Sequence, residues 1–483
     1  MIINSFSFFI FFSIVFFLYY FPLKGKTKYQ NLLLLLASYT FYGIANWKMI
    51  PILLISTLFF YWIGIEINKA SDKKSSMLTT LGVLSGIGLL FYFKYLDFFI
   101  QSFATLFNSI GLRTNWSTFG IIFPLGISFF TFRLISYIIE LHRGKIKPTY
   151  DFAAFATYIS FFPTIMSGPI DRPNDFIPQL EKKRPFDYNM AVDGTRQVLW
   201  GIFKKMLIAD NLSHFINAVW TDVPNQNTTT LVIAAFLYTI QMYADFSGYS
   251  DMAIGVGKIL GFRITKNFNY PFFARNIAEY WQKWHISLTS WVTDYVFMPL
   301  NIKFRKMDNV GIILAIIINM IIIGIWHGAN WTFAIFGLYH GLLYIPLIIR
   351  GTFGKRKKLK ANKYGLPTLN DLFKMGITFA LVSFGLIIFR AESIAQAWQY
   401  IVVTLSAGDI FSLTTDGLRA LIPTLLCMIA MFVAEWLQRD KEYPLQLDTV
   451  ITNKYIRFAL FWAIILVTVL YSGEEQEFIY FQF

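Results

Sequence analysis

The sequence is poor in charged residues. Asp, Glu, Lys and Arg make up only 14% of its 483 residues, against about 25% in an average soluble protein. A soluble surface needs charge to stay hydrated, whereas here 56% of the residues are hydrophobic and 19% are aromatic. These proportions exclude an ordinary soluble protein and predict an integral membrane protein.

Cysteine and several common catalytic motifs are also scarce or missing. Cys427 is the single cysteine, which excludes an internal disulfide and a cysteine-rich metal site. The chain has no phosphate-binding Gly-x-x-x-x-Gly-Lys-Ser/Thr loop, no Gly-x-Ser-x-Gly elbow and no His-Glu-x-x-His zinc motif. We therefore predict no metal site and no bound cofactor.

Linkers and low-complexity stretches are missing too, and apolar segments recur along the whole chain. We predict a single membrane domain over residues 1–483. The formal net charge of +14 does not indicate nucleic-acid binding. Its Lys and Arg residues lie in short loops between apolar runs, as the positive-inside rule requires.

Apolar runs of the length that crosses a bilayer, about 20 residues, define the predicted spans. They cover residues 6–23, 32–47, 50–67, 78–98, 119–141, 310–326, 331–349, 372–389, 420–436 and 458–471, with further interrupted apolar helices between 152 and 262. The first run has basic residues after it and none before it. A cleaved signal peptide has the reverse arrangement, so we expect this run to be retained as a span.

The loops then predict an orientation. Basic clusters at residues 24–28, 69–74 and 143–147 alternate with loops that carry few basic residues. The clusters should face the cytoplasm, which places the N-terminus outside. The same rule places residues 303–306 and 355–363 inside, and the link between Trp326 and Trp331 on the outer side or partway down.

One region breaks this alternation. The loops at 143–147 and 182–184 are both basic, yet the sequence between them is apolar and then rich in proline, which breaks helices. We interpret it as a segment that enters the membrane and returns to the same side. Irregular backbone at that depth needs partners from protein or a wet cavity, so we expect an enclosed cavity.

Five histidines are candidates for catalysis. His142 in a basic loop is expected to be solvated, His214 has the position of a helix-end residue without a catalytic role, and His340 could simply bond a neighbouring helix. His327 ends a long apolar run before Gly328, a common place for a helix to stop. Ionisable groups at membrane depth usually line functional cavities, but a helix-capping role is equally open from position alone.

His285 lies in an aromatic stretch. At helical spacing, Trp281, Trp284, His285, Leu288 and Val292 share one face. An interfacial aromatic belt and the wall of a substrate channel are both possible, and spacing slightly favours the belt.

A polar cluster follows the apolar run 231–242. Residues 243–251 contain Asp245, Tyr249 and Asp251 among further hydroxyl groups. We expect them to be paired, to order a helix break near the cavity, and to serve structure rather than catalysis.

Five segments, in order, resemble signatures of the membrane-bound O-acyltransferase (MBOAT) family. They are residues 123–132, 167–170, 245–251, 279–287 and 325–331. The closing residues 478–483, Phe-Ile-Tyr-Phe-Gln-Phe, are similar to the family's bacterial branch, which O-acetylates alginate and peptidoglycan. The same tail is a candidate docking element for a partner, although a packed chain end explains it equally well.

The resemblance implies an all-α, polytopic membrane protein, with a ring of transmembrane and re-entrant helices around a central tunnel. His327 matches the family's essential histidine, and His285 matches a second polar position that is asparagine in many relatives. The tunnel or substrate-binding residues are then predicted to be Trp281, Trp284, Ser287, Trp326, Asn330, Asp245 and Tyr249.

The implied activity is transfer of an acetyl group from a cytoplasmic thioester, acetyl-CoA, to hydroxyls of an extracytoplasmic polysaccharide or to an exported esterase-like partner. We expect membrane lipid to surround the protein. A hydroxyl needs a base to remove its proton, a role we assign to His327, while His285 would bind the thioester carbonyl or orient the donor. Direct transfer and a covalent relay stay open. The alternatives are a D-alanyl transferase of the teichoic-acid type, fed by a carrier protein, and a transporter or flippase.

Overall fold

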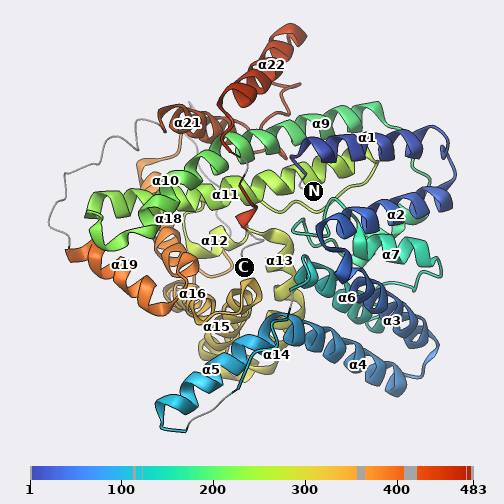
Figure 1. Ribbon diagram of the computed structural model, residues 1–483, viewed down its shortest axis with the longest axis horizontal. Coiled ribbons are helices and arrows are strands. Elements are labelled where there is room, and N and C mark those ends of the chain that lie inside the picture. Colours follow the sequence, from blue (N-terminus) through green and yellow to red (C-terminus); the bar gives the residue numbers. More distant parts are fainter. Residues whose placement is uncertain are drawn as a thin grey trace. The chain divides into compact units, whose positions relative to one another are not determined.

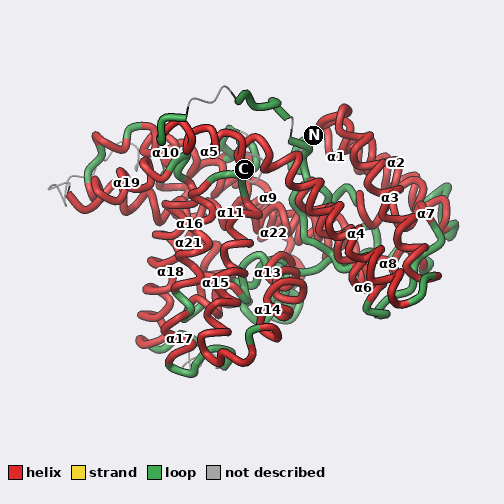
Figure 2. Tube along the Cα trace, turned by 90° about the horizontal axis from the view of Figure 1, so that it is seen from below, coloured by secondary structure: helices red, strands yellow, loops and turns green. Residues whose placement is uncertain are grey.

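The computed structural model describes residues 3–112, 116–121, 123–355, 365–406, 421–474 and 476–479. Within these ranges the chain forms helices and no β-strand (Figure 1). Figure 2 shows the same chain as helices joined by loops. The predicted all-α class is confirmed.

Seven helical stretches of the described chain are long and apolar enough to cross a membrane. They are Thr27–Lys69, Asp72–Ser109, Thr228–Ile259, Arg305–His327, Trp331–Ile349, Leu369–Arg390 and Lys454–Tyr471. Helices α1 (Phe6–Tyr20) and α21 (Ile422–Leu437) are apolar but shorter. These helices confirm a polytopic membrane protein, while the ring around a tunnel stays a prediction. Residues 356–363 of the basic loop, residue 420 of a predicted span and residues 480–483 of the tail lie outside the described chain.

The described helices belong to two compact units. Unit 1 contains Met1–Val198 and Met252–Thr265, and unit 2 contains Leu199–Asp251 and Lys266–Phe483. Unit 1 holds α1, α2 (Thr27–Asn46), α3 (Ile50–Lys69), α4 (Asp72–Leu90), α5 (Leu96–Ser109), α6 (Ile127–His142), α7 (Phe152–Ser160), α8 (Pro173–Glu181) and most of α9 (Tyr188–Ile202). Unit 2 holds α10 (Asp210–Thr221), most of α11 (Thr228–Ile259), α12 (Ile277–Trp281), α13 (Ile286–Val292), α14 (Met298–Lys303), α15 (Asp308–His327), α16 (Trp331–Leu342), α17 (Ile345–Ile349), α18 (Leu369–Arg390), α19 (Ile394–Ser406), α21 and α22 (Lys454–Tyr471).

One predicted span in unit 1 begins later than its apolar run suggests. The run starts at residue 119, but α6 begins at Ile127. Gly126 adopts a left-handed conformation with φ 74°, and a Cβ there would lie 2.3 Å from the carbonyl oxygen of Ile165. Only glycine fits this backbone approach, so the helix cannot extend further toward residue 119.

The proline-rich segment of unit 1 behaves as its composition predicts. Helix α7 has nine residues, about 14 Å at 1.5 Å per residue, which is too short to cross a bilayer. The buried irregular backbone that follows is bound by the guanidinium of Arg133, which donates to the carbonyl oxygens of Tyr158 (3.2 Å), Ile159 (3.2 Å), Thr164 (3.3 Å) and Pro169 (3.1 Å). A protein side chain therefore supplies the partners that this buried backbone needs, while the path of the segment into the membrane and back stays a prediction.

In unit 2, helices α15 and α16 form a tightly packed hairpin (Figure 1). A Cβ at Gly324 would lie 2.1 Å from the carbonyl oxygen of Phe333, and one at Gly337 would lie 2.3 Å from that of Met320. Small residues allow helices in membranes to approach this closely. We call this pair of close approaches the glycine contact, because it fixes α15 against α16.

Candidate active site

His327 is the last residue of α15 and is 5% exposed. Gly328 ends the helix in an extended conformation, with φ −165°, so the left-handed turn typical of helix-ending glycines is not used. Glycine is required here because a side chain at position 328 would not fit. A Cβ at position 328 would lie 2.0 Å from the ring of Phe333.

Asn330 begins the next helix. Its side-chain oxygen accepts a hydrogen bond from the Thr332 amide (3.1 Å), and its side-chain nitrogen donates to the carbonyl oxygen of Glu392 (2.7 Å). This is the capping role that asparagine fills at helix starts. Asn330 thus shapes the turn that follows His327.

His285 lies between two short helices, which corrects the continuous helical face predicted for residues 281–292. Helix α12 ends at Trp281 and α13 begins at Ile286. His285 itself is left-handed, with φ 45°, a conformation uncommon for any residue with a side chain. The aromatic residues of this segment are nevertheless buried, because the two helices turn their apolar sides inward.

Asn267 holds this unusual turn in place. Its carbonyl oxygen accepts from the Ile286 amide (2.8 Å), and its side-chain oxygen accepts from the amide (3.3 Å) and hydroxyl (2.9 Å) of Ser287. Its side-chain nitrogen donates to the hydroxyl of Ser250 (3.2 Å). Ser287 therefore contributes to the position of His285, since its polar groups are bound to Asn267.

The structure brings His285 and His327 together. Their ring centroids lie 6.2 Å apart, and the Trp326 ring lies 5.6 Å from His285 and 5.2 Å from His327. Phe246 packs edge-on against His285 at 4.7 Å. Burial, and to a lesser extent the neighbouring His327, lowers the pKa of His285 well below its ordinary value, so this ring is neutral.

His327, but not His285, borders a cavity in unit 2. Its lining is formed by Met242, Tyr280, Trp281, Trp284, His327, Phe336, His340, Val382, Leu386 and Phe389. Three of the predicted site residues, Trp281, Trp284 and His327, meet here. The walls are mostly aromatic and aliphatic with a few polar groups, and the cavity is small, about 10 Å³, which is room for about one water molecule.

Asp245 and Tyr249 face the C-terminal segment. The carboxylate of Asp245 accepts from the Ile479 amide (2.8 Å) and pairs with Lys205 (2.8 Å), which also pairs with Asp210 (2.8 Å). Burial alone would lower the pKa of Lys205, but the two carboxylates raise it above its ordinary value, so the lysine stays charged. The Tyr249 ring stacks on Phe478 at 4.8 Å.

The expected helix break at residues 243–251 is wrong, because α11 runs through them and the carboxylates are paired by lysines instead. The structural interpretation of this cluster agrees with these contacts. Phe478 and Ile479, the described part of the tail, are buried, as expected for a packed chain end.

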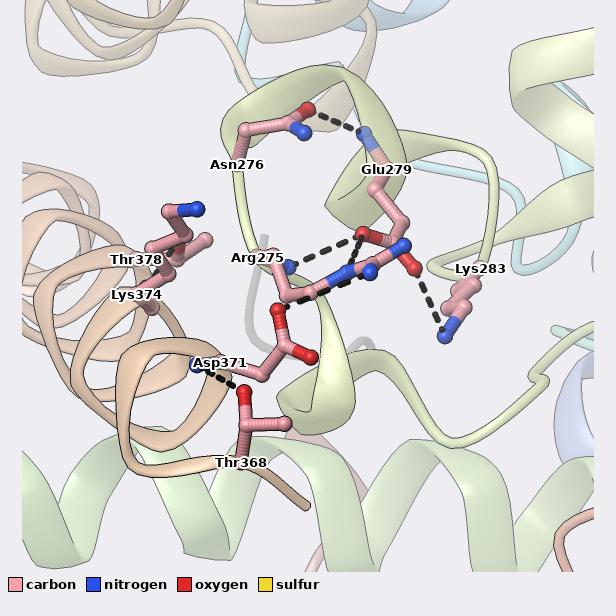
Figure 3. A network of polar contacts seen from close by, with 8 residues as sticks. All are labelled: Arg275, Asn276, Glu279, Lys283, Thr368, Asp371, Lys374 and Thr378. Carbon is pink, nitrogen blue, oxygen red and sulfur yellow. Dashed lines mark hydrogen bonds and ion pairs between the residues drawn. The ribbon is translucent and has the colours of Figure 1, made fainter. Parts of the chain in front are cut away.

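Charged residues fasten α12 to the start of α18 (Figure 3). Arg275 pairs with Glu279 (3.2 Å) and with Asp371 (3.6 Å), and Glu279 also pairs with Lys283 (3.4 Å). Asn276 and Thr368 cap the two helices. The network therefore positions Tyr280 and Trp281 on one side of the cavity relative to α18 on the other.

Comparison with known proteins identifies the family. A family model described as "MBOAT, membrane-bound O-acyltransferase family" matches residues 143–386. The probable alginate O-acetylase AlgI of Pseudomonas aeruginosa is 36% identical over 408 residues, which are 83% of this chain and 74% of that protein. The chain belongs to the membrane-bound O-acyltransferase family.

Other members of this family show a graded similarity. The peptidoglycan O-acetyltransferase of Helicobacter pylori is 29% identical over 456 residues, 88% of this chain and 81% of that protein. The teichoic acid D-alanyltransferase of Bacillus subtilis is 30% identical over 281 residues, 56% of this chain and 69% of that protein. The similarity to the two O-acetylating relatives therefore extends over more of this O-acyltransferase.

The sequence interpretation missed three residues of the site. His340 bonds a neighbouring helix as expected, since its Nδ1 accepts from the indole N–H of Trp281 in α12 (3.3 Å), but it also lines the cavity together with His327. Phe389 packs against His327 at 5.2 Å, and Asn267 holds the His285 turn. His340 was the one with a visible signal, because an imidazole inside an apolar helix is costly without a role.

Proposed function

We propose that this O-acyltransferase moves an acetyl group from a cytoplasmic thioester, acetyl-CoA, to hydroxyls of an extracytoplasmic polysaccharide or to an exported esterase-like partner. The observation that carries the proposal is the position of His327. It is buried, lines an aromatic cavity and lies beside a second imidazole, within the range that matches the family.

His327 acts as the general base. A hydroxyl is a weak nucleophile at neutral pH, so its proton must leave as the new ester bond forms. His327 takes this proton, the carbon–sulfur bond of the thioester breaks, and the released thiolate takes up a proton. His285, neutral and fixed by its backbone, orients the reacting groups next to His327.

Acetyl transfer is preferred to D-alanyl transfer on the extent of the similarity. The alginate- and peptidoglycan-acetylating relatives match 83% and 88% of the chain, whereas the D-alanyltransferases match 55% and 56%. In this proposal residues 1–483 work as one multi-pass domain of the cell membrane, with the N-terminus outside and a tunnel between the donor and acceptor sides.

A donor assay tests the proposal. The purified full-length protein is reconstituted in liposomes and supplied with radiolabelled acetyl-CoA or with a D-alanyl carrier protein, each with a hydroxyl acceptor. Acetyl transfer that depends on His327 is the expected result. Transfer only from the charged carrier would replace acetyl-CoA as donor, and solute flux that persists in His327→Ala without any acyl transfer would favour a transporter.

A matched pair of reactions tests whether glycan acetylation also needs the exported esterase-like partner. The protein is incubated with acetyl-CoA and the polysaccharide, with and without the neighbouring exported esterase-like protein. We expect glycan acetylation to require the exported protein. Complete acetylation by this chain alone would reject the partner while leaving the role of His327 intact.

A further inference from the structure

Helices α4 and α6 of unit 1 indicate where the hydrocarbon core of the bilayer ends along this part of the chain. They pack antiparallel, with polar contacts at both ends. The Ser75 hydroxyl lies 3.0 Å from Nδ1 of His142, and the Lys94 ammonium lies 3.5 Å from the Ser128 hydroxyl. Ser75 and Lys94 are 19 residues apart, about 28 Å at 1.5 Å per residue. This length matches a hydrocarbon core of about 30 Å, so the chain after Lys94 lies beyond the core.

Helix α5 continues α4 past this point. Asp72–Ser109 is one helical stretch of 38 residues, about 57 Å long, which is nearly twice the thickness of the core. Its last 14 residues form α5, and none of them is buried against the described chain. Figure 1 shows α5 extending beyond α4. Contacts with the described residues therefore leave α5 uncovered.

One side of α5 is apolar. Spacings of four, three and four residues place four large apolar side chains on the same side of the helix. We call them the α5 stripe: Phe99, Phe103, Leu106 and Ile110. Phe103, Leu106 and Ile110 are 50%, 55% and 64% exposed. An apolar surface of this kind is costly in water, so we expect another phase or molecule to cover it.

The opposite side of α5 is polar and receives the returning chain. Asp97 in the first turn accepts hydrogen bonds from the backbone amides of Phe119 (3.0 Å) and Ile121 (3.1 Å). Gln101 and Asn108 lie on the same side as Asp97, four and eleven residues further on. The described part of the return segment is thus held on the polar side, away from the α5 stripe.

The α5 stripe continues an exposed side of α4. The ring of Phe99 stacks on that of Phe91 at 5.6 Å and on that of Phe103 at 6.3 Å. Leu84, Ile87 and Phe91 are 60%, 52% and 44% exposed and lie between Ser75 and Lys94, so lipid covers them. One apolar surface therefore runs from the spanning part of α4 onto α5, and the lipid that covers the first part is next to the second.

The residues between the two helices allow α5 to turn onto the membrane surface. Phe91–Tyr95 is a π-helical turn, a common place for a helix to bend. We propose that α5 is an interfacial helix that lies on the lipid bilayer beyond Lys94, with the α5 stripe among the acyl chains and Asp97, Gln101 and Asn108 in water. In the proposed orientation of the chain, this surface belongs to the outer leaflet.

The charge of the helix specifies the kind of lipid contact. No charged residue occurs from Phe98 to Leu112, so binding depends on buried apolar area and not on attraction to anionic headgroups. Interfacial anchors set the tilt of the spanning helices to which they are attached. Helix α5 would thus fix how α4 and the α6 helix packed against it are inclined in the bilayer.

Spin labels around the helix test the proposal. In a Cys427→Ser background, single cysteines carry a nitroxide at three positions of the α5 stripe (Phe103, Leu106, Ile110) or at three on the polar side (Gln101, Thr105, Asn108). The full-length protein is reconstituted in phosphatidylcholine vesicles. Labels on the stripe should collide with oxygen, which dissolves in lipid, and lie about 5–10 Å below the headgroups. Labels on the polar side should collide with a water-soluble nickel chelate.

A matched pair of charge variants tests which side binds. Phe103→Asp with Leu106→Asp places two carboxylates on the α5 stripe, whereas Gln101→Asp with Thr105→Asp places the same charge on the polar side. A label at position 110 should move into water in the first variant and stay in lipid in the second. Because no residue of α5 is buried against the described chain, both variants should fold as the parent protein does. A label that stays in lipid in both would overturn the inference.

The same measurements distinguish the other ways to cover the α5 stripe. Access of the nickel chelate at all six positions would show a helix that stands in water, as a docking site for an exported protein would. Low access of both reagents to the stripe would show a protein contact, such as one with a second copy of this chain. Lipid contact only in vesicles that contain phosphatidylglycerol would require a charge that α5 lacks. Each of these results would overturn the inference, and none depends on acyl transfer or its donor.

Discussion

The imidazole rings of His285 and His327 lie 6.2 Å apart between centroids and are inclined by 45°. His327 is held by the end of α15, whereas His285 is held by a left-handed residue between α12 and α13. Trp326 packs against both rings. The two side chains are thus positioned by separate pieces of backbone, and their contributions can be tested one at a time.

His327→Ala is expected to abolish acyl transfer, because the acceptor hydroxyl loses its base. The loss is measured as transfer of radiolabelled acetyl groups in membranes. The variant protein should still insert into the membrane and should melt cooperatively in thermal denaturation in detergent. His214→Ala is the matched control, since His214 is exposed and should keep full activity. An active His327→Ala protein would remove His327 from the mechanism.

Gly328→Ala should lower both stability and activity. The added methyl group would lie 2.0 Å from the Phe333 ring, which forces the end of α15 away from α16. Because the backbone at 328 is extended, alanine itself is not strained there, and the smaller side chain of Phe333→Ala should make room. The double variant is expected to cost less than the sum of the single ones. Additive losses in melting temperature would show that the clash is relieved some other way.

Asn267→Ala should reduce activity through the His285 turn. It leaves the buried amide and hydroxyl of Ser287 without their acceptor, at a cost of about 1–3 kcal/mol in the free energy of unfolding. Asn267→Asp keeps a side-chain oxygen for both groups and should retain more stability and more activity. Equal behaviour of the two variants in chemical denaturation and in acetyl transfer would exclude this positioning role.

Asp171 should make stability depend on pH. Burial raises the pKa of its carboxyl from 3.8 to about 6, Arg133 opposes this shift, and Asp175 adds to it. Because the folded state holds the proton more tightly than the unfolded state, the stabilisation is complete below about pH 4 and is lost as the pH rises through about 6. The loss is on the order of 3 kcal/mol.

Asp171→Asn tests this sign directly. The asparagine can still accept from the Thr265 amide but does not titrate, so the variant should be relatively more stable above pH 6 than below pH 4. The measurement is the difference in melting temperature between variant and wild type from pH 4 to pH 7.5. A difference that stays constant would place the titration on another group.

The proposed orientation can be checked by cysteine labelling. In a Cys427→Ser background, single cysteines replace Ser5 and Ser76, which lie just outside the predicted spans 6–23 and 78–98, and intact cells are treated with an impermeant maleimide. With the N-terminus outside, the cysteine at 5 is labelled and the one at 76 is protected until the cells are lysed. The opposite pattern would reverse the topology of the chain.

Hydropathy and motif order predicted much of this molecule. Apolar runs located the long helices, because transfer into lipid depends on composition more than on distant partners. The turn at His285 could not be predicted, since its left-handed residue is held by Asn267, a neighbour from another segment of the chain. The continuity of α11 was missed for a similar reason. Its buried carboxylates are paired by Lys204 and Lys205, which lie in a different helical segment.

Only those residues of the candidate site that are recognisable from the local sequence were predicted. His327 and its flanking glycine stood out as a polar end to an apolar helix. His340 was also visible as an imidazole inside an apolar run, but its place beside His327 depends on contacts with other helices, such as its hydrogen bond with Trp281 of α12. Contacts between side chains of different helices depend on the tertiary structure, so they could not be predicted from one sequence.

The glycine contact between α15 and α16 also decides which wall of the cavity can change. The two backbones touch at Gly324 and Gly337. A larger residue at either position would separate the helices and displace His327 of α15 and His340 of α16 together. The opposite wall, on α18, presents side chains to the cavity without such backbone contact at Val382, Leu386 and Phe389. Selection for a bulkier or smaller acyl group can therefore act on about two turns of α18 while His327 and His340 keep their spacing.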